Sequence, residues 1–83
     1  ELAPPWTTVN AIAPGPLDTD MLRAVNPPGS AGDEFIRGTI PVGRLGEPGD
    51  IANAASYFLD TRSSFTTGQV LFVCGGMSIG RAG

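Results

Sequence analysis

The chain has 83 residues, a formal net charge of −3, and no histidine. Its few basic residues are scattered arginines, whereas nucleic acids and anionic membrane surfaces recruit clustered Lys and Arg. No apolar run approaches the roughly 18 residues that a membrane-spanning helix needs. We therefore expect neither a nucleic-acid partner nor a membrane partner.

The cysteine content bounds the chemistry further. Cys74 is the only cysteine, so an internal disulfide is excluded, and without histidine a structural zinc site has almost no ligands. We expect no metal site. Cys74 stands in an apolar run and is predicted to be a buried thiol in a strand. The lone cysteine and the lack of a targeting signal favour a cytoplasmic protein.

The first predicted element is a short strand over residues 7–13, which are rich in β-branched residues. The run Pro14-Gly15-Pro16 is expected to end it, because proline and glycine mark turns. Asn10 within this strand is predicted to bond neighbouring backbone.

Residues 17–46 are predicted to form a long, largely irregular excursion. Segments of that length inside a domain are usually lids or binding loops. Within it we expect a helical turn at 17–25 with Asp18 or Thr19 as N-cap, a loop at 27–32, and at best a helical fragment at 33–37.

The clearest predicted helix covers residues 48–60. Pro48 suits the first helical position, and Asp50 places negative charge at the positive end of the helix dipole. One apolar stripe is expected on this helix, formed by Ile51, Ala54, Ala55, Phe58 and Leu59.

Residues 69–74 read as a second strand, nearly all apolar, as in a parallel strand covered on both faces. Gly75 and Gly76 should end it. The order strand, excursion, helix, strand predicts one βαβ unit with two parallel strands. Two strands cannot form a stable doubly wound sheet, so we expect the remaining strands to lie N-terminal to Glu1.

Three segments carry a family likeness. Residues 9–19 (VNAIAPGPLDT), 44–52 (RLGEPGDIA) and 67–76 (TGQVLFVCGG) resemble, in this order and spacing, the C-terminal part of short-chain dehydrogenases/reductases. The resemblance covers about residues 8–76. It implies an α/β fold with a Rossmann-like doubly wound parallel sheet, in which residues 1–83 supply only the last βαβ unit and 17–46 form a substrate lid.

The resemblance also implies cofactor contacts. Pro14 and Gly15 match a turn that lies against the nicotinamide half of NAD or NADP. The backbone of Leu17 matches a partner of the carboxamide, and the hydroxyl of Thr19 matches a partner of the carboxamide or phosphate. Thr19 could equally be an N-cap, and Pro-Gly-Pro a plain turn. The charge that separates NAD from NADP follows the family's second strand, which this chain lacks.

No catalytic residue is assigned in this chain. The family uses a serine, a tyrosine and a lysine four residues after the tyrosine, but this chain has no lysine, and Thr61 stands where Tyr57 would need it. The resemblance therefore implies the C-terminal part of an NAD(P)-dependent oxidoreductase that interconverts a secondary alcohol and a ketone. The chain alone is expected to be inactive.

The family commonly assembles through its last helix and last strand, which implies a homo-oligomer, typically a homotetramer. A second interpretation remains open, in which the chain is a non-catalytic assembly or binding segment derived from the same fold.

Overall fold

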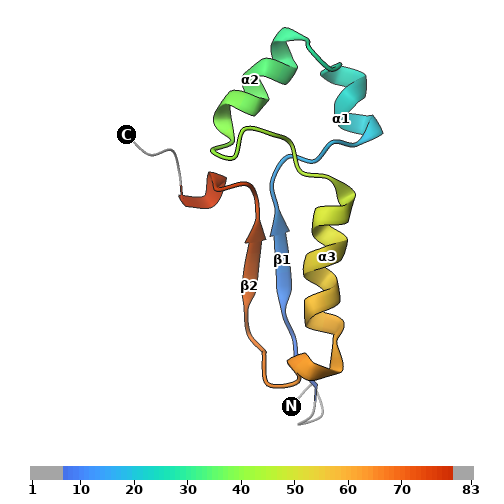
Figure 1. Ribbon diagram of the computed structural model, residues 1–83, viewed down its shortest axis with the longest axis vertical. Helices are drawn as coiled ribbons and strands as arrows, with labels where there is room; N and C mark the ends of the chain where they lie inside the picture. The colour runs from blue at the N-terminus through green and yellow to red at the C-terminus, as the bar shows by residue number, and fades with distance from the viewer. Residues whose placement is uncertain (1–6, 80–83) are drawn as a thin grey trace.

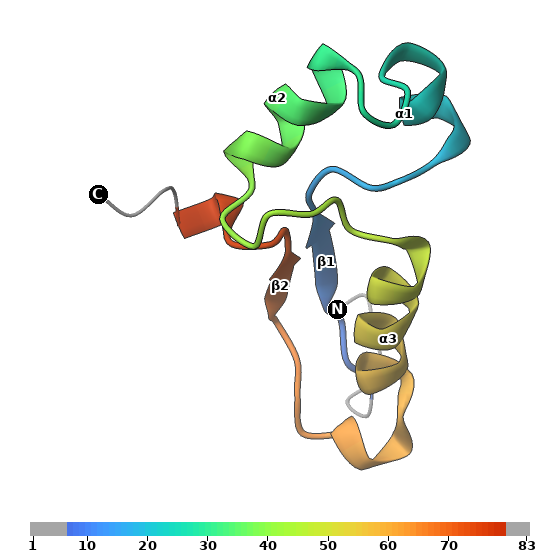
Figure 2. The same ribbon diagram turned by 45° about the horizontal axis from the view of Figure 1, so that its top comes forward.

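The computed structural model describes residues 7–79. Two parallel strands lie side by side, one helix runs back along them, and two shorter helices lie together beyond the carboxyl ends of the strands (Figures 1 and 2). The elements are β1 (Ala11–Pro14), α1 (Asp20–Val25), α2 (Ala31–Thr39), α3 (Pro48–Leu59) and β2 (Val70–Val73), with 3₁₀ turns at Thr61–Ser63 and Met77–Ile79. Within this part of the chain, no helix is long and apolar enough to cross a membrane.

The predicted βαβ unit is confirmed: β1 pairs with β2 in parallel, with Ala11 opposite Val70 and Pro14 opposite Val73. β1 includes Pro14, although we expected the strand to end before it. The Ala11 amide donates to the carbonyl of Gln69, just before β2, and the Gly15 amide donates to the carbonyl of Val73, both at 2.9 Å. Alternate residues of a strand face opposite edges, so the Pro14 nitrogen faces away from β2 and breaks no ladder bond.

β1 begins at Ala11, four residues later than predicted. Before this point side chains join the pairing, beside a backbone bond from the Gly68 N–H to the Val9 carbonyl at 2.8 Å. The Val9 amide donates to the Thr67 hydroxyl at 3.1 Å, and the Asn10 amide group bonds both the Thr66 carbonyl (3.1 Å) and the Gln69 N–H (3.0 Å). The expectation that Asn10 bonds neighbouring backbone is confirmed. Its two bonds hold the chain segments together just before the strands begin.

α1 confirms the helical turn expected within 17–25. The segment 17–46 is nevertheless less irregular than predicted, because α2 is a complete helix where only a fragment at 33–37 was expected. Thr19 caps α1 by accepting from the Leu22 N–H at 3.3 Å. Ser30 caps α2 by accepting from the Asp33 N–H at 3.1 Å, and α2 therefore begins inside the stretch expected to be a loop. A cap satisfies a backbone donor that the first helical turn leaves free.

α3 confirms the predicted helix to within one residue. Pro48 occupies the first turn, and the Asp50 carboxylate accepts from the Glu47 N–H at 2.8 Å. Most of the apolar stripe is partly buried and α3 contacts both strands. Leu59 was wrongly included in the stripe, since it is 82% exposed at the last position of the helix.

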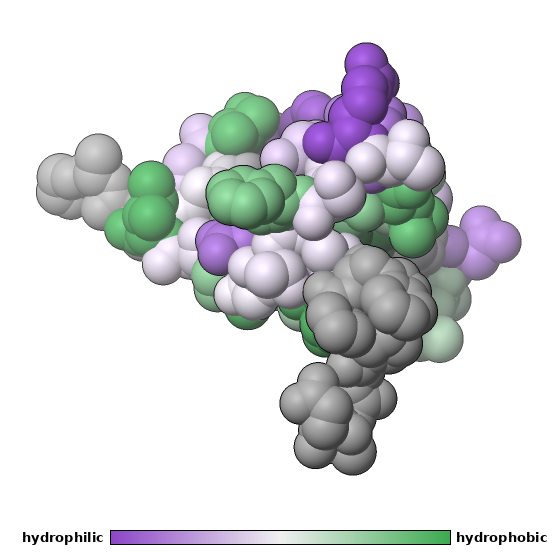
Figure 3. Space-filling view, turned by 90° about the horizontal axis from the view of Figure 1, so that it is seen from below, coloured by the Kyte–Doolittle hydropathy of each residue, from purple (hydrophilic) through white to green (hydrophobic). Residues whose placement is uncertain are grey.

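Little apolar surface is buried within the described residues. The buried hydrophobic side chains are Ile40 and Leu45, where the segment before α3 crosses the strand ends. β2 instead leaves Val70 and Phe72 more than half exposed, so this part of the chain does not supply the cover expected on both faces. Figure 3 shows apolar patches open to solvent at the lower end of the molecule.

The strand ends approach each other closely at Gly15. A Cβ atom on Gly15 would lie 2.9 Å from the Cys74 Cα and 3.2 Å from the Cys74 carbonyl oxygen. Real Cβ atoms do not come this close to backbone, so the two chain segments can lie this near only because residue 15 has no side chain.

We predict that Gly15→Ala lowers the free energy of unfolding of the native protein by about 1–3 kcal/mol, as overpacking does. Gly38→Ala is the matched control, because a Cβ at Gly38 meets nothing within 4 Å. It should be neutral or stabilising by up to about 1 kcal/mol. Urea unfolding measures both, and equal stability of the two variants would contradict the close approach.

Candidate functional site

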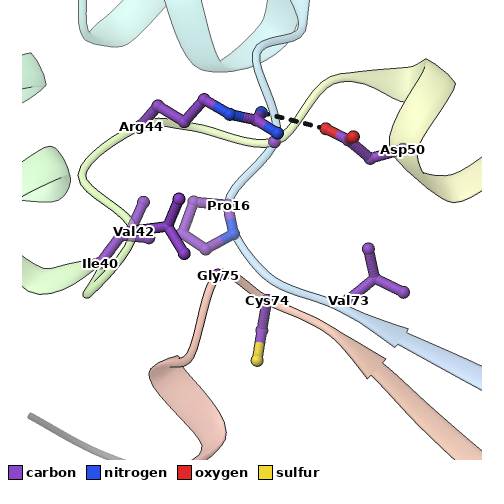
Figure 4. A pocket seen from close by; sticks show the side chains of 9 residues that line it. Pro16, Ile40, Val42, Arg44, Asp50, Val73, Cys74 and Gly75 are labelled. Carbon is purple, nitrogen blue, oxygen red and sulfur yellow. Dashed lines mark hydrogen bonds and ion pairs between the residues drawn. The ribbon is translucent and has the colours of Figure 1, made fainter.

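A hollow of about 130 Å³ opens at the carboxyl ends of both strands. Figure 4 shows Pro16 in the middle of the lining residues, with the Arg44–Asp50 pair on one side and Ile40 and Val42 on another. Ligands of open α/β sheets bind outside the carboxyl ends of the strands. The hollow is lined by Pro16, Ile40, Val42, Arg44, Gly46, Asp50, Val73, Cys74 and Gly75.

Arg44 and Asp50 form the polar side of this hollow. The Arg44 Nη1 donates to the Asp50 carboxylate at 3.1 Å and to the Leu45 carbonyl at 2.9 Å. The hydrogen bonds that Asp50 accepts from Arg44 and from the Glu47 N–H hold the pKa of its carboxyl below the ordinary value. Asp50 was predicted to place its charge at the N-terminus of the helix, and its bond to the Glu47 N–H agrees with that prediction. Arg44 bonds Asp50 and the local backbone.

Leu17 lies next to the hollow with its main-chain groups open. An isolated parallel bridge joins Leu17 to Gly46. The Asp18 N–H donates to the Gly46 carbonyl at 2.7 Å, and the Gly46 N–H donates to the Pro16 carbonyl at 2.9 Å. In such a bridge the N–H and C=O of Leu17 itself face the other way. Neither is bonded to any residue in the described range 7–79. A donor and an acceptor are therefore presented together.

Thr19 has one hydrogen-bonding function left. Its oxygen accepts from the Leu22 N–H, which confirms one of the two predicted roles. A hydroxyl that accepts can still donate its own proton. The capping contact therefore fixes the side chain two residues beyond Leu17 while leaving a donor for a ligand.

Pro14 and Gly15, the other predicted contact residues, lie at the end of β1. The close approach of Cys74 already explains why residue 15 is glycine, without any ligand. The predicted residues thus lie along one short segment from Pro14 to Thr19, of which Pro16 lines the hollow. Pro16 carried no prediction of its own.

A buried ionic cluster in the excursion was missed by the sequence analysis. The carboxylate of Asp33 is fully buried and accepts from Arg23 Nη1 and Arg37 Nη2, both at 2.6 Å, and from the Gly29 N–H at 3.0 Å. The Gly29 amide and the two guanidinium groups hold the pKa of Asp33 far below its ordinary value. The i, i+4 spacing of Asp33 and Arg37 was a visible signal, but nothing in the sequence indicated Arg23.

Two further residues have potentially reactive side chains: Cys74, which lines the hollow, and Tyr57, which lies away from it. Cys74 was predicted to be buried in a strand, but it follows the end of β2 and is partly exposed. Its Sγ lies 3.3 Å from the Ser78 hydroxyl and accepts from the Ser78 N–H, and these contacts lower the pKa of the thiol. The Tyr57 hydroxyl lies 3.1 Å from that of Thr66, at the opposite end of the strands from the hollow. No metal-binding cluster occurs among residues 7–79.

Comparison with known proteins shows the family to which the chain is related. The family described as enoyl-(acyl carrier protein) reductase, a branch of the short-chain dehydrogenases/reductases, matches residues 1–78. The chain belongs to the short-chain dehydrogenase/reductase family. Its relatives include an uncharacterised oxidoreductase of Bacillus subtilis, 46% identical over 92% of this chain. A 3-oxoacyl-(acyl-carrier-protein) reductase of Escherichia coli is 42% identical over 93%.

Solved structures of this family share the fold. A putative 2-deoxy-D-gluconate 3-dehydrogenase from Agrobacterium tumefaciens, solved with bound NADP, is 36% identical and superposes with a TM-score of 0.76 over 87% of this chain. The βαβ unit is thus a partial Rossmann-like fold, as predicted. The chain spans 30% of the length of each of these two relatives and 29% of that solved chain.

The ionic cluster predicts how the excursion responds to acid. The pKa values of Asp18 and Asp33 are lower in the folded chain than their ordinary 3.8, so each carboxylate stabilises the fold above that value. This contribution is lost only as the pH falls through the lowered values. Hydrogen exchange of α1 and α2, corrected for intrinsic rates, should show constant protection from about pH 8 to pH 5. Loss of protection between pH 6 and 5 would contradict this assignment.

Proposed function

We propose that this chain is the C-terminal part of an NAD(P)-dependent oxidoreductase that interconverts a secondary alcohol and a ketone by hydride transfer. In this proposal, residues 1–83 are one portion of a single nucleotide-binding domain, and the catalytic serine, tyrosine and lysine lie outside the chain. The family membership and the open strand surfaces of the βαβ unit support this interpretation.

The open main-chain groups of Leu17 carry the cofactor part of the proposal. A nicotinamide carboxamide has one acceptor and two donor hydrogens, which match a neighbouring backbone N–H and C=O. The Thr19 hydroxyl adds a donor for the carboxamide or for a phosphate oxygen. Pro14 and Gly15 form the start of this contact segment. The chemistry present therefore fits the nicotinamide end of NAD or NADP, and the bound cofactor would supply the hydride in ketone reduction and accept it in alcohol oxidation.

The residues of this chain would orient the cofactor and exclude water rather than move protons. The described part contains neither a lysine nor a tyrosine at the carboxyl ends of the strands. The helices α1 and α2 lie directly beyond those ends, where a small alcohol or ketone would have to enter. We assign residues 17–46 as the substrate lid, and the chain without its N-terminal counterpart as inactive.

The exposed apolar residues suggest two further contacts. Val70 and Phe72 of β2 would be covered by the N-terminal part of the fold or by a second copy of the protein, and Leu59 and Tyr57 of α3 are also exposed. We propose a homo-oligomer through α3 and β2, with a tetramer as the expected form. The cytoplasmic location stays a prediction.

The alternative, a non-catalytic assembly segment, is favoured by the same exposed strand. The two proposals differ at Thr19 and Leu17, because an assembly segment has no use for open polar groups facing a ligand. Binding of a nicotinamide cofactor by the native protein therefore separates them.

We predict that the native protein binds NADH or NADPH, and that Thr19→Val weakens this binding roughly tenfold by removing one hydrogen bond to the cofactor. Thr19→Ser is the matched control, since it keeps both the hydroxyl and the cap. Fluorescence titration of the reduced cofactor measures the dissociation constants. A native protein that binds neither cofactor would overturn the proposal in favour of the assembly segment. Equal binding by Thr19→Val and Thr19→Ser would remove Thr19 from the site.

A further inference from the structure

The lid is built around one buried charge. Asp33 lies in α2 with no exposed surface, and its carboxylate bonds Arg23 from α1, Arg37 from α2 and the backbone of Gly29 between them. A buried carboxylate is tolerated only where its partners are in place. The two helices are therefore held together as one unit by a charge that cannot be left unpaired.

One of the two arginines also reaches outside this unit. Arg23 uses a second edge of its guanidinium group to bond Asp18, with Nε at 2.8 Å from Oδ1 and Nη2 at 3.2 Å from Oδ2. This fork-to-fork geometry fixes the orientation of both planar groups. Arg23 is only 22% exposed, whereas Arg37, which bonds Asp33 alone, is 47% exposed.

Asp18 stands between the two proposed cofactor contacts. Leu17 precedes it with open main-chain groups, and Thr19 follows it with the capping hydroxyl. The Asp18 amide is already tied to Gly46 at 2.7 Å. Its side chain is bonded to Arg23, so both the backbone and the side chain of Asp18 are held in place.

We propose that Arg23 is a positioning residue that couples the lid to the cofactor-binding turn, by joining the buried Asp33 to Asp18. The inference rests on the proposed function, because it assumes that Leu17 and Thr19 contact the nicotinamide end of the cofactor. The bond between Arg23 of α1 and Asp33 of α2 then sets the orientation of these two contacts. Arg23 touches neither cofactor nor substrate, and acts through Asp18.

The two arginines provide a matched pair of variants. Arg23→Gln and Arg37→Gln each remove one 2.6 Å bond to Asp33, but Arg23→Gln also removes the link to Asp18 and a 3.3 Å bond to the Asn26 carbonyl. Asp18→Ala breaks the same link from its exposed end and leaves the bonds between Asp33 and both arginines intact. If Arg23→Gln does not fold, Asp18→Ala still tests the link between Arg23 and Asp18.

Two probes separate positioning from general loosening of the fold. The reduced cofactor that the native protein binds more tightly contains the nicotinamide, and ADP-ribose, or its 2′-phosphate if that cofactor is NADPH, lacks it. Arg23→Gln and Asp18→Ala should weaken the dinucleotide roughly five- to tenfold and the ribose probe by less than about twofold. Arg37→Gln should change neither affinity by more than about twofold, while hydrogen exchange in α2 becomes faster.

Three results would overturn the inference. Equal loss of affinity for both probes in Arg23→Gln and Asp18→Ala would show a general structural role. Equal effects of Arg37→Gln and Arg23→Gln on the dinucleotide would show that the link to Asp18 does not matter. If the unaltered native protein binds no nicotinamide cofactor, the proposed function fails together with this inference. If the unaltered protein binds the cofactor and only the expected differences in affinity among the variants are missing, the proposed function stands and the inference alone fails.

Discussion

The parallel pairing of β1 with β2 is the constraint on which the rest of the structure depends. The register brings Pro14 opposite Val73, so the two strands end side by side and the chain segments that follow them meet. Gly15 allows this approach because it has no side chain to collide with Cys74. The segment before α3 then crosses these ends, and the hollow forms where it contacts both turns. A shift in register would separate all these parts.

The polar interactions beyond the strands are ordered around that junction. The Arg44–Asp50 pair lies at the start of α3, the bridge between Leu17 and Gly46 holds the turn after β1, and the Asp33 cluster links α1 to α2. Each of these contacts ties backbone to backbone or charge to charge, and together they leave the N–H and C=O of Leu17 unused. In a family that binds nicotinamide cofactors, open groups of both kinds in one place favour a ligand site over a plain turn.

The sequence predicted the βαβ order, α3 and the place of Asp50 at the start of α3, because those depend on local signals: Pro48 in the first helical turn and a regular apolar stripe. It predicted only a helical fragment at 33–37 in place of α2, since the composition of residues 27–32 indicated a loop where Ser30 in fact caps the helix. The position of Arg23 between two carboxylates depends on how α1 and α2 are placed relative to each other, which residue spacing does not reveal. Burial of β2 was predicted from its apolar composition, but the described part of the chain leaves it open.

Amide exchange at Ile12 in the native protein tests the central claim, that this βαβ unit completes a larger parallel sheet, most directly. The Ala11 and Gly15 amides bond β2, so the Ile12 amide faces the other edge of β1 and has no partner among residues 7–79. If another strand of the protein lies along that edge, Ile12 is predicted to exchange as slowly as Ala13. Rapid exchange at Ile12 beside a protected Ala13 would show that β1 is an edge strand and would contradict the account.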